Sequence, residues 1–557
     1  MRLLVIFLMG CVQKTPGLAV PSAASDAADT ADVGSFDLDA DDTGTVEPED
    51  LDEGPPDTGS GDSGAPPLDG DSGAPPVDCE ACTASEVFAV HAIAEDTFVA
   101  APERTRDNPL KGFMTSYLWG EPYNDFPDQM EFLYIPMAQL WNASGDTLES
   151  GLEPYLVQAE ERGHHAVLRV FVDYPTRPSG LPDYLDGVVS CSIYTEHGGG
   201  CSPDYEHPAL QEAMFGLISA LGDRYDGDPR LGFIQVGLLG FWGEWHTWPH
   251  GDWFPSEATQ DAILEAYEDA FSVTRLQLRY PVSTSVERRI GFHDDSFAHS
   301  TLGDVEWFFL PRMEAAGAAD RWQSVPIGGE LRPELQGSVY RDDYVLGEYA
   351  QDIDECIDQT HATYLLNYYA FNGAGYGYTG EERERAEESA LAMGYTFELV
   401  GARLEASGLM DGEVDIHLEV DIAQTGVAPF YYPLFLTVAV PGSETTLASD
   451  DDLSSVLPGD VQTVRVDLGR LDVGTLNMPF TLGLESDMLI PGQTIAFATL
   501  TPGSTDDGST PIQWSLGCET ESGMVTFGQT VGVSEEGCDC VCDVDGALWT
   551  CKGEPCE

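Results

Sequence analysis

The stretch LGFIQVGLL at residues 231–239 is almost wholly apolar, and HAVLRVFVDY at residues 165–174 has the same character. Apolar runs of this length are typical of strands with both faces buried, as in a parallel sheet that helices cover. Between the two runs, residues 208–225 have the spacing of apolar positions expected of an amphipathic helix. These three segments predict a strand, a crossover helix and a second, parallel strand.

The same alternation continues on both sides of these segments. About eight strand and helix units within roughly 270 residues fit a (β/α)8 barrel of the TIM type. We therefore predict an α/β protein with such a barrel over residues 88–385, and a doubly wound open sheet is the alternative. The other predicted strands are residues 112–119, 132–140, 277–282, 289–293, 326–330 and 362–369, and the other helices are residues 152–162, 256–276 and 352–361.

Beyond the barrel the pattern changes to a period of two residues. Short runs such as VDIHLEVDI and TVRVDLG, separated by Gly, Pro and Asp, predict an antiparallel β-sandwich over residues 394–502. Residues 513–557 are too few to build a hydrophobic core of their own. Because they are rich in cysteine, we predict a small disulfide-rich module there.

The first eleven residues read MRLLVIFLMGC. The apolar run after Arg2 is far shorter than the roughly 20 residues that span a bilayer, so it is a processing signal and not a membrane helix. Leu8-Met9-Gly10-Cys11 resembles the bacterial lipobox, in which the cysteine is lipidated. The resemblance implies an exported lipoprotein, anchored through Cys11 to the outer membrane or cell surface. A chance apolar start with a buried cysteine is the alternative.

Residues 12–82 consist mainly of Asp, Glu, Thr, Ser, Gly, Ala and Pro, and GDSGAPPLD at 61–69 is repeated at once as GDSGAPPVD. Such a segment cannot bury enough apolar surface to offset its chain entropy, and its like charges extend it. We therefore expect a disordered acidic linker. A calcium-binding array at 37–42 is the alternative, although the segment lacks the Gly and the final Glu of an EF-hand loop.

Acidic residues outnumber basic residues 97 to 24, which gives a formal net charge of -73. A field of this sign repels phosphate backbones, so the composition excludes nucleic acid as a partner. The partners that we expect are a carbohydrate and, through the lipid anchor alone, a membrane.

The chain has 12 cysteines. With Cys11 set aside an odd number remains, so at least one cysteine is unpaired or pairs between chains. Export makes disulfides plausible. We expect one between Cys191 and Cys201 and three in the C-terminal module, whereas Cys356 has no obvious mate. The cysteines of the C-terminal module are Cys518, Cys538, Cys540, Cys542, Cys551 and Cys556.

The motif GLLGFWGEWHTWPHGDW at residues 237–253 carries the strongest chemical signal. Four of the ten tryptophans of the chain lie in it, and Glu244 stands between two of them, Trp242 and Trp245. The carboxyl ends of barrel strands form the active-site face. A carboxyl group there, desolvated by indole rings that can stack on a sugar, has the raised pKa of a general acid. The alternative is that the tryptophans belong to the core and Glu244 pairs with an arginine.

A second carboxylate with the same placement is Glu330, which ends the predicted strand VPIGGE. By strand count Glu244 follows the fourth strand and Glu330 ends the seventh. This arrangement resembles that of retaining glycosidases with a barrel fold, and the resemblance implies that Glu244 is the acid/base and Glu330 the nucleophile. Carboxyl groups about 5 Å apart retain the anomeric configuration, whereas groups about 6.5–9.5 Å apart invert it.

Other polar residues near predicted strand ends could complete a substrate pocket, although each alone could be a structural salt bridge or cap. A metal site formed by His246, His250 and Asp252 is an alternative for the motif. No zinc signature matches it, and we predict neither a metal nor a cofactor. The candidates for the pocket are Trp242, Trp245, His246, Arg169, Asp173, His293, Asp294, Asp295, Asn367 and Tyr369.

Two further resemblances extend over most of the chain. Asn108-Pro-Leu-Lys-Gly-Phe113, Gly243-Glu-Trp-His-Thr247 and the sandwich after the barrel resemble the uncharacterised bacterial families known as domains of unknown function 4832 and 4874, over roughly residues 100–500. That resemblance implies a glycoside hydrolase-like barrel. The tail resembles a pacifastin or von Willebrand factor C type of module in Cys540-x-Cys542, Gly546, Trp549 and Cys551-x4-Cys556, which implies a binding or spacer role.

The sequence therefore predicts a cell-surface lipoprotein whose glycoside hydrolase-like barrel acts on a carbohydrate through Glu244 and Glu330. The alternatives are a carbohydrate-binding surface protein without turnover and a purely adhesive protein. Since a fold hosts many functions, the fold contributes only by analogy to this hypothesis.

Overall fold

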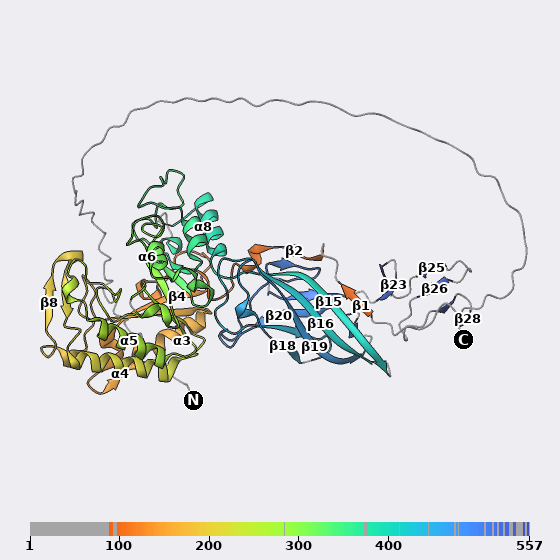
Figure 1. The fold of residues 1–557 in the computed structure, drawn as a ribbon, viewed down its shortest axis with the longest axis horizontal. Coiled ribbons are helices and arrows are strands. Elements are labelled where there is room, and N and C mark those ends of the chain that lie inside the picture. Colours follow the sequence, from red (N-terminus) through yellow and green to blue (C-terminus); the bar gives the residue numbers. More distant parts are fainter. Residues whose placement is uncertain are drawn as a thin grey trace, which may run out of the picture. The chain divides into compact units, whose positions relative to one another are not determined.

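The computed structural model describes residues 97–514 apart from short gaps at 283, 373–376, 411–412, 444, 473–474, 477 and 506–507. It also describes the backbone of short strands at 89–92 and between 517 and 555. These residues belong to one compact unit, Pro76–Glu557 (Figure 1). The predicted signal with Cys11 and the linker at 12–82 lie outside the described residues and remain predictions. No helix of the described part is both long and apolar enough to cross a membrane.

Eight parallel strands form one sheet in the order β3-β14-β13-β12-β11-β10-β7-β4. A hydrogen bond from Phe132 N to Thr115 O (2.9 Å) and a parallel bridge between Thr115 and Glu131 join its two edges. The predicted (β/α)8 barrel is thereby confirmed, and the doubly wound sheet is excluded. The strands are β3 (Gly112–Met114), β4 (Met130–Pro136), β7 (His165–Phe171), β10 (Leu231–Gln235), β11 (Arg275–Leu278), β12 (Ile290–Phe297), β13 (Ile327–Leu331) and β14 (Ala362–Leu366).

Helices follow the predicted segments closely and bury one face each. In α4 the side chains of Leu210, Met214, Leu217 and Leu221, spaced three or four residues apart, are fully buried. The helices are α1 (Met137–Leu140), α2 (Leu148–Gly151), α3 (Glu153–Arg162), α4 (Pro208–Tyr225), α5 (Glu257–Ala270), α6 (Phe309–Ala315), α7 (Ile353–Thr360) and α8 (Glu381–Ala392).

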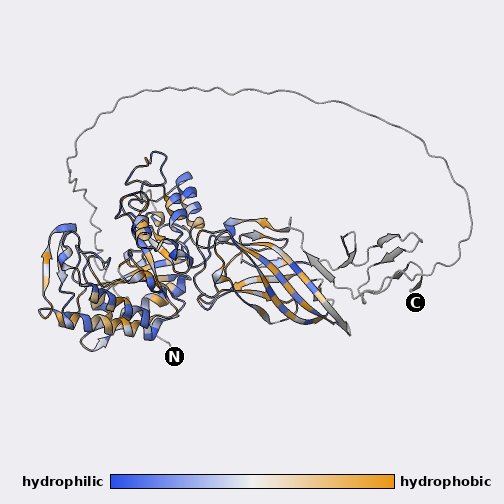
Figure 2. Cartoon of the chain, viewed as in Figure 1, coloured by the Kyte–Doolittle hydropathy of each residue, from blue (hydrophilic) through white to orange (hydrophobic). Residues whose placement is uncertain are grey.

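The predicted β-sandwich is made of two antiparallel four-stranded sheets. Buried and exposed residues alternate along its strands, and Figure 2 shows hydrophobic and hydrophilic residues alternating there. Two strands that precede the barrel in the sequence also pair with this region, β1 with β15 and β2 (Val99–Ala100) with β21 (Thr499–Leu500). One sheet contains β1 (Ala89–Ala92), β15 (Phe397–Met410), β16 (Glu413–Gln424) and β19 (Val461–Asp472), and the other β18 (Thr446–Asp452), β17 (Phe435–Ala439), β20 (Phe480–Glu485) and β22 (Thr510–Ile512).

The sandwich covers the amino-terminal ends of the barrel strands. Tyr432 donates a hydrogen bond to Gly232 O of β10 and accepts one from Arg275 N of β11 (3.0 Å). Asn108 and Ala496 exchange two hydrogen bonds, of 3.0 and 2.8 Å. Apolar residues of the barrel strands and of the sandwich also form a single buried cluster. This end of the barrel is therefore closed, which leaves the opposite end for chemistry.

Lys111, at the start of β3, lies in this junction. Its ammonium group donates to Leu391 O (2.9 Å) and Tyr395 O (2.8 Å), and the residue is only 4% exposed. Burial lowers the pKa of Lys111 to about 7. The side chain thus satisfies backbone carbonyls between barrel and sandwich.

Disulfide predictions are tested at one place. Cys191 and Cys201 form a disulfide, with Cα atoms 5.5 Å apart, across the hairpin of β8 (Cys191–Tyr194) and β9 (Gly200–Pro203), which confirms that prediction. Cys356 is buried on α7 with a free thiol.

In the tail the structure describes short hairpin strands, and the strand register places Cys540 opposite Cys551. The side chains of the tail cysteines lie outside the described residues, so the three disulfides there remain a prediction. The strands are β23 (Gly517–Thr520), β24 (Gly523–Thr526), β25 (Thr530–Val533), β26 (Asp539–Val541), β27 (Thr550–Cys551) and β28 (Glu554–Pro555).

Candidate functional site

The segment after β10 is folded into an unusual loop. The apolar run was predicted to continue as a strand to residue 239, but β10 ends at Gln235. Leu238, Trp242 and Trp245 then have positive φ angles of 70, 55 and 60°. Each such non-glycine residue costs on the order of 1–3 kcal/mol and persists only where the surroundings enforce it. Backbone strain is therefore concentrated next to Glu244.

Tyrosine hydroxyls and an indole enforce this loop. Tyr280 donates to Trp245 O (2.6 Å), Tyr134 donates to Trp242 O, and the indole of Trp245 donates to Val236 O (2.7 Å). Because these contacts fix the backbone on both sides of Glu244, its carboxylate is held in one direction, toward the charged side chains of neighbouring barrel strands.

Two arginines and two carboxylates form a buried network at the carboxyl ends of the strands. Arg169 of β7 lies 2.7 Å from Asp295 of β12 and 3.4 Å from Glu244. Arg279, directly after β11, lies 2.7 Å from Asp295 and 2.9 Å from Glu244. His293 adds a contact of 2.8 Å to Asp295. The charges of the arginines and of the carboxylates balance within this network.

The arginines decide the protonation of their partners. Burial alone would raise the pKa of Glu244, but the charges of Arg279 and Arg169 outweigh it and the pKa is lowered. Burial likewise opposes ionisation of Asp295, and Arg169, His293 and Arg279 hold its pKa well below the usual range. Both carboxyl groups are therefore ionised near neutral pH.

Glu330, on β13, is in the opposite condition. It is partly buried, and its carboxyl group makes no hydrogen bond or ion pair with any residue that the structure describes. Burial, together with the negative charges of Asp295 and Glu244, raises the pKa of Glu330 to about 8. A protonated carboxyl group thus stands within electrostatic range of an ionised one, and this is the separation that acid/base chemistry requires.

A polar layer inside the barrel supports Arg169. The Nε of Arg169 donates to Gln235 (2.8 Å), and Gln235 donates in turn to the hydroxyl of Tyr364 (3.2 Å). Tyr364 donates to Gln277, which donates to Phe292 O (3.1 Å). The sequence analysis missed these supporting residues. A signal was present for Gln235, which is the single polar residue of the otherwise apolar strand β10.

Arg279 was also missed by the sequence analysis. It follows the apolar run LQL at 276–278 directly, at the carboxyl end of the fifth barrel strand. A charged residue at the exit of a barrel strand is the same signal that singled out Arg169 and Asp295. The predicted strand at 277–282 contained Arg279, so its position at an exit was not recognised.

Three of the predicted substrate-binding residues make structural contacts. Trp245 is 1% exposed, packs against Phe254 and bonds Val236 O, so its indole faces are not available to a sugar. Asn367 is fully buried and accepts from Ala370 N (3.4 Å) as a cap of the following turn. Tyr369 packs on Tyr378 with ring centroids 5.1 Å apart. Trp245 and Asn367 are therefore too buried to contact a ligand in this structure, whereas Tyr369 is only partly buried and its role in the pocket remains a prediction.

Asp173 and Asp294 have local partners. Asp173 accepts from the hydroxyl of Tyr194 (2.7 Å) in the β8–β9 hairpin. Asp294 accepts from Thr301 (2.7 Å) and so fixes the loop after β12. Burial raises the pKa of each to about 6. Both aspartates position loops rather than joining the charged network.

Trp242, Trp248 and two histidines form an aromatic wall beside Glu244. The ring of His197, at the tip of the disulfide-linked hairpin, lies 4.9 Å from Trp242 and 6.3 Å from Trp248. His246 lies 5.9 Å from Trp242 and 3.5 Å from the Glu244 carboxylate. Trp248 is 70% exposed. The predicted roles of Trp242 and His246 in the pocket are therefore compatible with this geometry.

His250 points away from this wall. It stacks on Trp253 at 3.8 Å and pairs with Glu196 at 3.2 Å. Within the described ranges, no group of three or more His, Cys, Asp and Glu side chains could hold a metal ion. The alternative metal site from His246, His250 and Asp252 is not assembled.

The alternative interpretation of the motif, with core tryptophans and a Glu244–arginine pair, is right in part. Glu244 does pair with arginine, and Trp245 does belong to the core. Trp242 is only partly buried against the core, and Trp248 is 70% exposed. The motif thus combines a structural half with a half that is open to a ligand.

Comparisons with known proteins yield weak likenesses. A calcium-binding mutant of β-glucuronidase 2 from Bacteroides uniformis is similar at 9% identity and a TM-score of 0.25, over 78% of this chain and 51% of that one. A β-glucosidase from Erythrobacter marinus is similar at 11% identity and a TM-score of 0.16, over 72% of this chain and 47% of that one. This chain thus covers about half the length of either protein. At these values the likenesses say nothing about its activity.

No family model and no curated protein matches the chain. The resemblances to the two uncharacterised families and to the Cys-rich modules therefore remain predictions.

Proposed function

We propose that this protein is a glycoside hydrolase-like enzyme that acts on a carbohydrate through two carboxyl groups. One observation carries the proposal. Glu330, with a pKa raised to about 8, lies within electrostatic range of an ionised Glu244 at the carboxyl end of a (β/α)8 barrel. An acid and a carboxylate in one site are what cleavage of a glycosidic bond requires.

The charges of the resting site favour an assignment of roles opposite to the one that the glycosidase resemblance implies. Glu330 would protonate the leaving oxygen, because it holds a proton at neutral pH. Glu244 would stabilise the positive charge that develops at the anomeric carbon, as nucleophile or as base for a water. Arg169 and Arg279 keep Glu244 ionised and in place.

The aromatic wall would orient the sugar. The indoles of Trp242 and Trp248 lie next to the ring of His197, and His246 joins Trp242 to Glu244. Their apolar faces suit the C–H faces of a pyranose ring, and their edges leave its hydroxyls free for carboxylates. No cofactor takes part in this scheme.

The competing function is carbohydrate binding without turnover. It is favoured by the two arginines on Glu244, because a carboxylate held by two cations is a weakened nucleophile. The two functions make different forecasts for the same variants.

A glycan panel separates the two functions. The unlipidated full chain, carrying Cys11→Ser, is screened for release of sugars and for retention on immobilised glycans. Under the enzymatic proposal, Glu330→Gln and Glu244→Gln abolish release but retain binding, and Trp242→Ala weakens both. Retention without release in the parent would favour the binding protein. Release that persists in both Gln variants would refute the two-carboxylate mechanism.

The place of action follows from the N-terminal sequence. We propose that Cys11 is lipidated after export, so that the barrel works at the outer membrane or cell surface, on a disordered acidic linker. Fatty-acid labelling of cells that express the parent and Cys11→Ser tests this. Labelling is expected in the parent alone, and labelling that persists in the variant would disprove the anchor.

A further inference from the structure

We propose that the substrate is a neutral oligosaccharide, and that its distal units lie on an aromatic platform formed by Trp307 and Tyr349. This inference rests on the proposed function, since it concerns how a sugar chain continues beyond Glu330. It names a second binding region, on the loops that follow the sixth and seventh barrel strands.

The platform consists of two exposed rings that are nearly parallel. Trp307 is 48% exposed and Tyr349 is 45% exposed. Their ring centroids lie 6.4 Å apart with an interplanar angle of 23°. Large aromatic side chains that gather on a surface commonly mark a binding site. Parallel exposed rings suit the flat apolar faces of successive sugar units.

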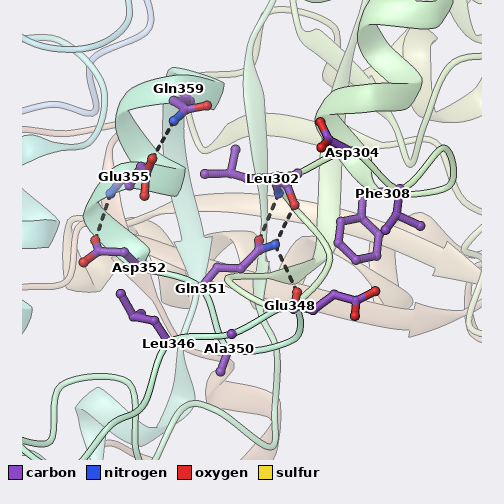
Figure 3. Close-up of a pocket in the computed structure, with 13 residues that line it drawn as sticks. Leu302, Asp304, Phe308, Leu346, Glu348, Ala350, Gln351, Asp352, Glu355 and Gln359 are labelled. Carbon is purple, nitrogen blue, oxygen red and sulfur yellow. Dashed lines mark hydrogen bonds between the residues drawn. The ribbon is translucent and has the colours of Figure 1, made fainter. Parts of the chain in front are cut away.

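A pocket adjoins the platform (Figure 3). Its volume is about 390 Å³, within the range of small-ligand sites. Phe308 and Glu348, the sequence neighbours of Trp307 and Tyr349, line it. Asp304 and Glu355 line it as well, so its polar groups are mainly carboxylates. Carboxylates accept hydrogen bonds from sugar hydroxyls and repel uronic acids or sulfated sugars, which is why we infer a neutral chain.

One side chain holds the two loops together. Gln351 donates to Leu302 O (2.6 Å) and to Glu348 O (3.3 Å), and it accepts from Leu302 N (2.9 Å), as Figure 3 shows. It also accepts from Thr301 N (3.0 Å). Because the segments that carry Trp307 and Tyr349 are joined at this point, the spacing of the two rings is fixed before a ligand arrives.

Electrostatic interactions and one ring contact relate the platform to Glu330. Tyr368 is 38% exposed. Its pKa is raised by partial burial and by the charges of Glu330 and Glu334, so it lies within electrostatic range of both. His299 lies within the same range of Glu334, and its ring is 5.0 Å from that of Tyr349. Glu334 thus relates the platform to the surroundings of Glu330, and this is why we place the distal sugar units at the platform.

Chain-length dependence tests the inference. The full chain with Cys11→Ser is assayed on neutral gluco-, xylo-, manno- and galacto-oligosaccharides of two to eight units and on the matching nitrophenyl monosaccharides. For the series that the parent hydrolyses, we expect kcat/KM to rise about tenfold with length, the worth of one stacking contact. Trp307→Ala and Tyr349→Ala should abolish this rise through KM, while kcat and the activity on monosaccharides stay unchanged.

Two further variants complete the test. Trp307→Phe should restore most of the length dependence. Tyr184→Ala is the matched control, because Tyr184 is 38% exposed and bonds Trp141 away from this platform.

Each outcome decides a different point. If Trp307→Ala matches the parent at every length while Glu330→Gln is inactive, the platform is refuted and the enzyme stands. If the parent retains long oligosaccharides without cleaving them and Trp307→Ala does not, the platform stands and hydrolysis is refuted. If the parent neither binds nor cleaves a neutral oligosaccharide, both are refuted. A preference for acidic oligosaccharides would overturn the inference of a neutral chain.

Discussion

The two ends of the barrel are made from the same eight strands but differ in how their polar groups are paired. At the amino-terminal end, groups of the sandwich bond to groups of the barrel, as Ala496 does to Asn108, and the ammonium group of Lys111 is bonded to two backbone carbonyls. At the carboxyl end, the loop after β10 holds three non-glycine residues at positive φ, and the carboxyl group of Glu330 has no hydrogen-bond or ion-pair partner among the described residues. Each end thus has a group with a perturbed pKa, but this group is bonded at the amino-terminal end and unpaired at the carboxyl end. We conclude that stability and chemistry are separated along the barrel axis.

The largest expected effect is on hydrolysis, at the carboxyl end. Glu330→Gln keeps the shape of the side chain but removes its transferable proton, so kcat/KM should fall by about 10²–10⁴. In the parent, kcat/KM should decline as the pH rises through about 8, because Glu330 then loses its proton. Pre-steady-state rates of the variant and the pH dependence of kcat/KM in the parent measure these two effects. Full activity in the variant would mean that Glu330 is not the acid.

The next effect concerns the charged network. Arg169→Gln removes one of the two cations that neutralise the buried carboxylates of Asp295 and Glu244, and this should cost about 3 kcal/mol of unfolding free energy. Denaturant titration measures it. The control is Arg341→Gln, which breaks an exposed pair with Asp343 and should change the unfolding free energy much less. Equal losses in the two variants would contradict the description of the network as buried.

A smaller effect is expected at the opposite end. Asn108→Ala leaves N–H and C=O of Ala496 without partners at the covered end of the barrel, at a cost of about 2 kcal/mol. The kcat of the folded variant should equal that of the parent. A lower kcat in the folded variant would mean that the two ends are coupled, and the separation proposed above would fail. Asn142→Ala, at an exposed turn, is the control.

The smallest effect is a change in how stability depends on pH. Glu330 titrates near pH 8 in the folded protein and near 4.5 when unfolded, so the folded state binds more protons between these values. The unfolding free energy should therefore fall as the pH rises from about 4.5 to about 8. Glu330→Gln should remove that part of the slope and be more stable than the parent at pH 9. Parallel stability curves for parent and variant would show that the pKa of Glu330 is ordinary.

The fold was predictable because the periodicity and the length of the apolar runs indicate its strands and helices. The runs at 165–174 and 231–239 gave two strands, and the helix expected at 208–225 is α4 to the residue. The end of β10 was not predictable. Val236 to Leu239 are as apolar as the strand, yet they leave it to pack the base of a strained loop, and tertiary contacts rather than propensity decide that turn.

The site was predictable only in outline. Glu244, Glu330, Arg169 and Asp295 were found because charged residues at the exits of apolar strands converge in a barrel. Which tryptophan is buried was not predictable, since Trp242 and Trp245 have nearly identical surroundings in the sequence. The difference arises from their backbone conformations, which turn one indole to the core and the other to the surface.

The burial of Lys111 has a practical consequence. The sequence contains only two other lysines, Lys14 and Lys552. Since Lys111 is 4% exposed and bonded to two carbonyls, amine-reactive reagents have no accessible lysine on the described barrel and sandwich. Coupling to a sensor surface through primary amines would therefore attach the chain near its ends. Such coupling would leave the described surface of the barrel and sandwich unmodified, so glycan binding could be measured on immobilised protein without an added tag.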